Sequence, residues 1–258
     1  MGHIRLGTLP TSKKWREVVA LLTGDASLEE IAAASSRAAE FELKRASDDP
    51  IFQFVAKMMV ELPLMARMPA IDAAGSERIK GVDVTSPDSI PALLSSVNEA
   101  IDQFTFENGR SSDIGLIAQS ALIEALSSKL HDNVPSLFTP EPAEIRSALG
   151  KYAGGQMFGD FAREFFARLT YKSLDYFLSR ELANHTGQGA RFVTDADRVH
   201  FQQALYQHSF EASRIVKEYA GGWYGKTVWR DQTLSDDAIR EFTKFSFKKM
   251  RSELGRRA

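Results

Sequence analysis

The sequence predicts an all-α protein, and three observations lead to that class. Apolar residues recur with the 3.6-residue period of a helix along most of the chain. Capping residues such as Ser12 and Ser27 stand directly before these periodic stretches. No hairpin dipeptide separates two alternating apolar and polar runs. We therefore expect a multi-helix, bundle-like globule with a short extended amino-terminal arm and a proline- and glycine-rich connection near residues 69–90.

In the first part of the chain, the predicted helices span residues 12–24, 27–46 and 48–68. Gly24 ends the first helix, since glycine readily leaves the helical conformation. The two glutamates that follow Ser27 suit the first turn of the second helix. Pro50 fits the first turn of the third. Because proline inside a helix removes a hydrogen bond, Pro63 predicts a kink or break near Leu62.

Beyond the connection, the predicted helices span residues 89–106, 112–130, 143–152, 161–187, 197–220 and 235–254. Gly187 and Gly189 end the long helix that begins at Phe161. The glycine-rich stretch "GGWYG" ends the helix that stops at Ala220. The connection suggests two parts, an amino-terminal arm and helical part over residues 1–68 and a main helical domain over 89–258. The same pattern also fits one continuous domain.

Composition narrows the class of protein. An apolar fraction of 43% and a charged fraction of 26% are ordinary for a globular protein. The chain has no cysteine, which excludes disulfides and thiolate chemistry and fits a reducing compartment. No apolar run reaches the roughly 18 residues of a membrane span, and we expect a cytoplasmic protein without membrane contact. The net charge is −2, yet residues 1–16 and 240–258 are both basic and the middle is acidic.

The long helix carries an aromatic arc and a charged side. At 100° per residue, the residues of the arc are Phe158, Phe161, Ala162, Phe165, Phe166, Leu169, Tyr176 and Phe177. This arc predicts core packing. Glu164, Arg168 and Asp175 fall on the opposite side, where we expect solvent.

Four residues on two helices form the candidate catalytic or metal set. Glu181 and His185 share one face of the long helix, while His208 lies on the apolar face of the next helix, three residues before Glu211. If these helices pack antiparallel, the four side chains converge in a set suited to a divalent metal or to proton transfer. The alternative is that His208 is a satisfied core residue and Glu181 and His185 are surface. Because the spacings differ from the Glu-x-x-His of carboxylate-bridged sites, we favour the alternative and predict no metal and no cofactor.

The last helix predicts a basic stripe. Arg240, Lys244, Lys248 and Arg251 fall on one side of it, opposite an apolar side that should dock on the domain. Basic residues near a helix carboxyl terminus complement the helix dipole, which is the structural interpretation. The functional alternative is a phosphate-binding stripe for nucleic acid.

The stretches "GHIRLGTLPTSKKWREVV" and "FAREFFARLTYKSLDYFLSRELANHTG" resemble segments of an uncharacterised bacterial protein family. The resemblance implies no activity, cofactor or catalytic residue. The residues favour a non-enzymatic helical subunit that binds other proteins in a bacterial assembly, with an arm that adds a strand to a partner or wraps its own domain. The partner-binding candidates are His3, Arg5, Leu6 and Trp15. A nucleic-acid-associated accessory protein of genome maintenance or anti-phage defence is the second hypothesis, and a metal-dependent enzyme is the third.

Overall fold

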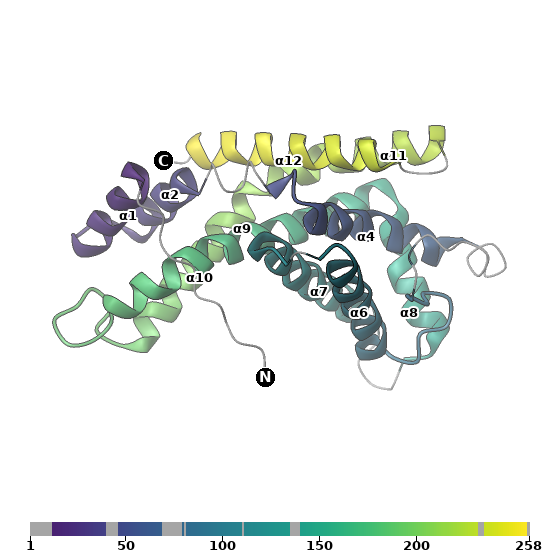
Figure 1. Cartoon of the computed structure of the whole chain (residues 1–258), viewed down its shortest axis with the longest axis horizontal. Coiled ribbons are helices and arrows are strands. Elements are labelled where there is room, and N and C mark those ends of the chain that lie inside the picture. The colour runs from purple at the N-terminus through teal and green to yellow at the C-terminus, as the bar shows by residue number, and fades with distance from the viewer. Residues whose placement is uncertain are drawn as a thin grey trace.

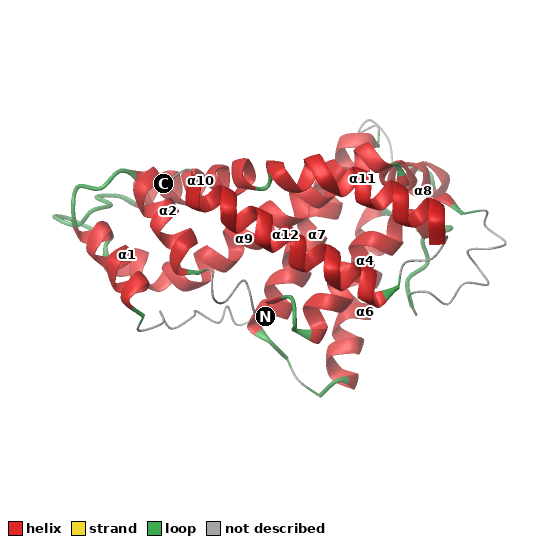
Figure 2. Ribbon diagram, turned by 90° about the horizontal axis from the view of Figure 1, so that it is seen from above, coloured by secondary structure: helices red, strands yellow, loops and turns green. Residues whose placement is uncertain are grey.

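A computed structural model describes residues 12–39, 46–68, 79, 81–109, 111–134, 140–231 and 235–256 of the chain. These residues form an all-α globule of helices packed on one another (Figures 1 and 2). The helices are α1 (Lys13–Thr23), α2 (Leu28–Ala38), α4 (Pro50–Arg67), α6 (Ile90–Glu107), α7 (Asp113–Asn133), α8 (Pro142–Gly150), the 3₁₀ turn η1 (Lys151–Ala153), α9 (Gly155–Asn184), α10 (Asp195–Ala212), α11 (Arg214–Asp231) and α12 (Asp236–Arg256). The all-α prediction is confirmed.

Local capping explains why the helices begin where they do. The Ser12 side chain accepts a hydrogen bond from the Trp15 amide at the start of α1. At the start of α2, Ser27 and Glu30 form a reciprocal capping box. Ser89 caps α6 in the same way, with a proline in the first turn. The sequence-predicted starts of these three helices are therefore confirmed to within one residue.

The 30-residue helix α9 is the centre of the fold (Figure 1). It packs against α7, which precedes it in the sequence, and against α10 and α11, which follow it. Its predicted aromatic arc is buried over Phe158, Phe161, Phe165 and Phe166, and the ring of Phe166 meets that of Phe247 on α12 edge to face. This confirms the core role of the arc.

The remaining helices surround this centre. In both views α1 and α2 lie at one end of the molecule, whereas α8 lies toward the other (Figures 1 and 2). Helix α4, before the predicted connection, packs against α6, α7, α8 and α12, all after it. Residues 69–78 and 80 of that connection lie outside the described residues, and the described residues 81–89 are not helical. No helix in the described part of the chain combines the length and apolarity needed to cross a bilayer.

Two predictions for the first helices need correction. Helix α2 ends at Ala38 rather than continuing to Ala46. Of the kink or break predicted near Leu62, the break is absent, because α4 continues through Pro63 to Arg67. Proline removes only one backbone hydrogen bond, and Pro63 is buried where α4 packs against α7 and α8, so tertiary packing keeps the last turn helical.

A third correction concerns residues 197–231. The predicted helix divides at Ser213 into α10 and α11, and the Ser213 hydroxyl donates to the carbonyl oxygen of Phe210. The stretch "GGWYG" does not end a helix but lies inside α11. Its first glycine, Gly221, lies in backbone contact with Gly155 of α9, which explains why glycine is present there.

Candidate functional site

The candidates for partner binding at the amino terminus divide into two groups. His3, Arg5 and Leu6 belong to the arm, residues 1–11, which lies outside the described residues. Trp15 is fully buried, with its ring centroid 5.3 Å from that of Phe177 on α9. Trp15 therefore anchors α1 to the core and leaves no surface for a partner to contact.

Helices α9 and α10 do pack antiparallel, as the metal-site hypothesis required. Near one end of the pair, Arg163 Nη2 on α9 lies 3.5 Å from Glu211 Oε1 on α10. Glu181 lies 18 residues further along α9, or about 27 Å at the helical rise of 1.5 Å per residue. The packing thus separates Glu181 and His185 from His208, which is half-buried, and from Glu211, which is exposed. Within the described residues, no group of three or more His, Asp or Glu side chains is arranged to hold a metal ion.

His185 instead lines an open hollow of about 730 Å³ at the far end of α9. The hollow lies between the α1–α2 turn, the loop after α9 and the first turn of α10. His200 and Asp197 also line it, and Asp197 is engaged in the capping box that starts α10. The Arg191 guanidinium donates hydrogen bonds to the carbonyl oxygens of Gly24 and Ala26, which ties the loop to the carboxyl end of α1.

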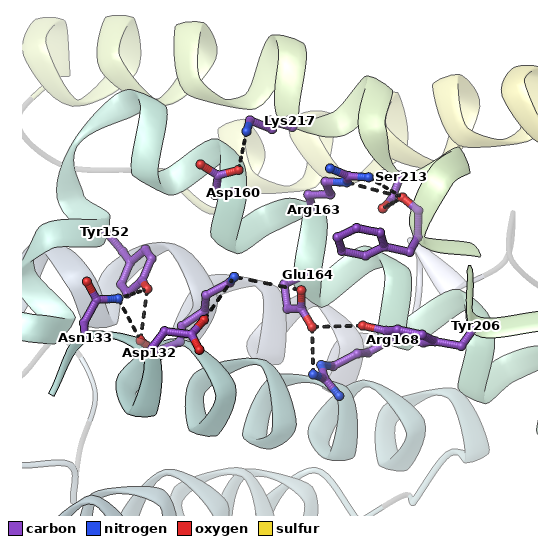
Figure 3. Close-up of polar contacts among 12 residues, drawn as sticks. Asp132, Asn133, Tyr152, Asp160, Arg163, Glu164, Arg168, Tyr206, Ser213 and Lys217 are labelled. Atoms are coloured by element: carbon purple, nitrogen blue, oxygen red, sulfur yellow. Dashed lines mark hydrogen bonds and ion pairs between the residues drawn. The ribbon is translucent and has the colours of Figure 1, made fainter. Parts of the chain in front are cut away.

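The charged side of α9 is not solvated, contrary to the sequence prediction. Glu164 is buried, with only 8% of its side chain exposed, because α7 and α10 cover that side. Arg168 Nη2 lies 2.7 Å from Glu164 Oε1, and the Tyr206 hydroxyl donates to the same oxygen across 3.1 Å (Figure 3). We call the connected set the α9 polar network; its members are Glu124, Lys129, Glu164, Arg168, Lys172 and Tyr206.

The α9 polar network joins three helices through paired charges. Arg168 also lies 3.2 Å from Glu124 on α7, and Lys172 lies 2.6 Å from the other oxygen of that carboxylate. Burial raises the pKa of Tyr206 to about 12, with Glu164 adding to the shift, so its hydroxyl stays protonated and donates near neutral pH. Each charge has an opposite partner, which makes this set a connector of α7, α9 and α10. The i, i+4 spacing of Glu164 and Arg168 was the only local signal of it in the sequence.

The predicted basic stripe on α12 is partly neutralised. Lys244 Nζ lies 3.9 Å from Asp48 and 3.9 Å from Glu241, while Arg240 lies 3.9 Å from Asp237. Lys248 is exposed, and the side chain of Arg251 lies outside the described residues. The predicted apolar side of α12 is buried at Ile239, Phe242, Phe247 and Met250. Phe245 on the same helix is 41% exposed.

An exposed acidic face on α6 was missed by the sequence analysis. Helix α6 has three acidic residues and no basic residue, and its buried side faces α4 and α7. At 100° per residue, its outward residues form what we call the α6 face: Glu99, Asp102, Gln103, Phe106 and Glu107, all of them exposed. Phe106 is 82% exposed, the most exposed large hydrophobic side chain in the described part of the chain.

The carboxylates of the α6 face accept hydrogen bonds from neutral neighbours. Ser95 donates to Glu99, Gln119 to Asp102 and Gln103 to Glu107. No basic side chain of the described residues forms an ion pair with these three acids, whereas the acids of the α9 polar network are all paired. As far as the described residues go, the α6 face therefore presents negative charge without a basic ion-pair partner, around one exposed aromatic ring.

No protein-family model, no curated protein and no solved structure matches this chain.

Proposed function

We propose that this protein is a non-enzymatic helical subunit that binds a basic protein partner through the α6 face. The observation that carries the proposal is the 82% exposure of Phe106 among acidic side chains. Aromatic side chains are enriched among the residues that dominate binding at protein interfaces. A surrounding ring of like charge steers a partner of opposite charge and disfavours others.

Two features support binding over catalysis. The α9 polar network pairs its charges with one another, and the Tyr206 hydroxyl donates to Glu164. These groups are therefore occupied in joining helices. The four residues of the metal-site hypothesis lie at two separate places along the α9–α10 pair, which weakens the case for an enzyme built on them.

Nucleic-acid binding is the alternative, and the contacts of α12 weigh against it. Two of the stripe residues, Arg240 and Lys244, already lie within 4.0 Å of carboxylates. Phosphate binding by these side chains would have to displace those pairs, which reduces the gain from each contact.

The test is site-specific photo-crosslinking in cells. Phe106 is replaced by p-benzoyl-phenylalanine, and a matched protein carries the same group at Val199, which is also an exposed helical hydrophobic residue but lies on α10. We expect a protein adduct at position 106 that is lost when Glu99→Lys and Asp102→Lys are added, and no such adduct at 199. Equal adducts at both positions, or none at 106, would overturn the proposal.

A further inference from the structure

The outward side of α12 is the chemical counterpart of the α6 face. Lys244, Phe245, Lys248 and Lys249 are exposed there, and we call them the α12 face. Phe245 is half-covered: its ring meets Tyr219 edge to face at 4.7 Å, and Lys249 Nζ lies 5.3 Å above its centre. One helix thus presents a phenylalanine among acids, and the other presents a phenylalanine beside Lys248 and Lys249, whereas Lys244 is partly neutralised by Asp48 and Glu241.

From this match we propose that the partner of the α6 face is a second copy of this chain, docked through its α12 face. The inference rests on the proposed function of the α6 face and names its partner. The complementarity of charge selects α12, because it carries exposed lysines beside an exposed aromatic ring. The two phenylalanines then exclude water at the centre of the contact, while the opposite charges lie around them.

The order of residues along the two helices sets their relative direction. On α6 the acids Glu99 and Asp102 precede Phe106, whereas on α12 the lysines 248 and 249 follow Phe245. If the two rings face each other, an antiparallel arrangement brings the acids and the lysines to the same end of the contact. At 1.5 Å per residue, Lys248 then lies about 1.5 Å from the level of Asp102, and Lys249 about 4.5 Å from the level of Glu99. Asp102 then lies on the same side as Lys248, and Glu99 lies on the same side as Lys249.

A parallel arrangement does the opposite. It sets Asp102 level with Glu241, a carboxylate, and leaves Lys248 and Lys249 about 10 to 12 Å from Asp102 along the axis at 1.5 Å per residue. Lys244, which already lies near Glu241, is then the nearest lysine, about 4.5 Å from that level. Like charges at close range oppose docking. The inferred contact is therefore antiparallel.

The size of the contact sets its strength. Each face offers about five side chains, compared with about 20 to 30 per side in a standard interface. We expect self-association that is weak, reversible and reduced by salt, because exposed charges supply much of the attraction. A reciprocal arrangement, in which each copy offers both faces, doubles the contact and closes a dimer; a one-sided arrangement extends into chains.

The first experiment is sedimentation equilibrium of the purified full chain at low and high ionic strength. We expect about tenfold or greater loss of self-affinity in Glu99→Lys/Asp102→Lys and in Lys248→Glu/Lys249→Glu, each measured alone. Mixing the two variants restores association, because every docking then pairs opposite charges. The control Glu17→Lys/Glu218→Lys makes the same charge change as Glu99→Lys/Asp102→Lys, but on exposed sites of α1 and α11, and keeps wild-type affinity.

A second variant distinguishes a loss of docking from a loss of folding. Asp102 accepts a hydrogen bond from Gln119, so Glu99→Gln/Asp102→Asn removes the charge and retains the acceptors. This variant should also lose self-affinity. Circular dichroism and thermal melting verify that each protein is folded before its affinity is compared.

The second experiment fixes the direction of the helices. Because the chain has no cysteine, single engineered cysteines give unambiguous disulfides. A mixture of Asp102→Cys with tagged Lys248→Cys should oxidise to the mixed dimer faster than Asp102→Cys with tagged Glu241→Cys. A faster reaction of the second pair would overturn the antiparallel contact.

The outcomes separate this inference from the proposed function. A wild-type protein that stays monomeric at low ionic strength, or that associates equally in all charge variants, overturns self-docking. If position 106 nevertheless crosslinks to a different protein in cells, the proposed function stands without the self-partner. Adducts of position 106 with the α12 face of a second copy support both the proposed function of the α6 face and self-docking.

Discussion

Gly221 on α11 lies so close to Gly155 on α9 that a Cβ atom built on Gly221 would be 2.5 Å from the Gly155 carbonyl oxygen. A Cβ atom on Gly159 would likewise lie 2.7 Å from the carbonyl oxygen of Lys217. Real Cβ atoms do not approach a carbonyl oxygen at these distances, so α9 and α11 touch backbone to backbone only because glycine is present at the crossing. This close approach lets α11 stack Tyr224 on Phe158 at a centroid distance of 3.9 Å.

The first prediction tests this crossing. Gly221→Ala should lower the free energy of unfolding by about 1 to 3 kcal/mol, the cost of overpacking a close contact. Gly222→Ala, one residue along the same helix with open space around it, should instead raise it by up to about 1 kcal/mol through helix propensity. Urea unfolding followed by circular dichroism measures both. Equal effects of the two substitutions would contradict the backbone contact.

The second prediction concerns the buried charge of the α9 polar network. Glu164→Gln should cost about 2 to 3 kcal/mol, below the about 3 to 5 kcal/mol of a fully buried pair because Arg168 and Lys129 reach solvent. Glu211→Gln is the matched control on the same α9–α10 interface. Its pair with Arg163 is longer, at 3.5 Å, and the Glu211 side chain is 47% exposed, so the pair should contribute about 1 kcal/mol or less. The comparison is made by urea midpoint at neutral pH. A Glu164 variant as stable as the Glu211 variant would mean that the network contributes little.

The third prediction is a pH dependence that arises from Tyr206. Burial raises its pKa to about 12 in the folded protein, compared with about 10 in an unfolded chain. Between these values the unfolded state releases the proton and the folded state holds it. The stabilising contribution is therefore complete below about pH 10 and is lost as pH rises through about 12.

Tyr206→Phe should make the loss of stability between pH 10 and 12 less steep. Tyr152 and Tyr171, whose pKa values burial also raises to about 12, keep part of the slope in the variant. Unfolding free energies at several alkaline pH values measure the slope, and values between pH 7 and 9 serve as the baseline. Identical slopes in the two proteins would assign the alkaline loss to other groups.

The fourth prediction addresses nucleic acid. Three phosphate contacts from Lys244, Lys248 and Arg251 would contribute about 2 to 3 to the slope of log affinity against log salt. Since Lys244 already lies near two carboxylates, we expect Lys244→Gln/Lys248→Gln/Arg251→Gln to leave that slope unchanged for DNA and RNA, single- and double-stranded. Fluorescence anisotropy across a salt series measures it. A steep wild-type slope that flattens in the triple variant would favour nucleic acid over the α6 face.

Local chemistry made the helix starts predictable. The caps at Ser12, Ser27 and Ser89 act through hydrogen bonds to amides three residues away, so a short stretch of sequence contains the whole interaction. The aromatic arc of α9 was predictable for a similar reason, because helical geometry alone puts those rings on one side. The candidate sites were harder to predict from the sequence than the helix starts. Whether Glu181 and His208 converge depends on how far two helices slide past each other, which neither helix specifies alone.

The sequence by itself determined the all-α class, the residues that start most helices and the side of α9 that enters the core. Each follows from interactions within about four residues along the chain. Only the tertiary structure decided that the charged side of α9 is covered, that a glycine run continues as helix, and that an acidic face on α6 stays open with Phe106 upon it. The physical reason is that burial depends on how two elements pack together. Glu164 is covered by α7 and α10, and glycine is needed at position 221 because the backbone of Gly155, 66 residues earlier in the chain, lies against it.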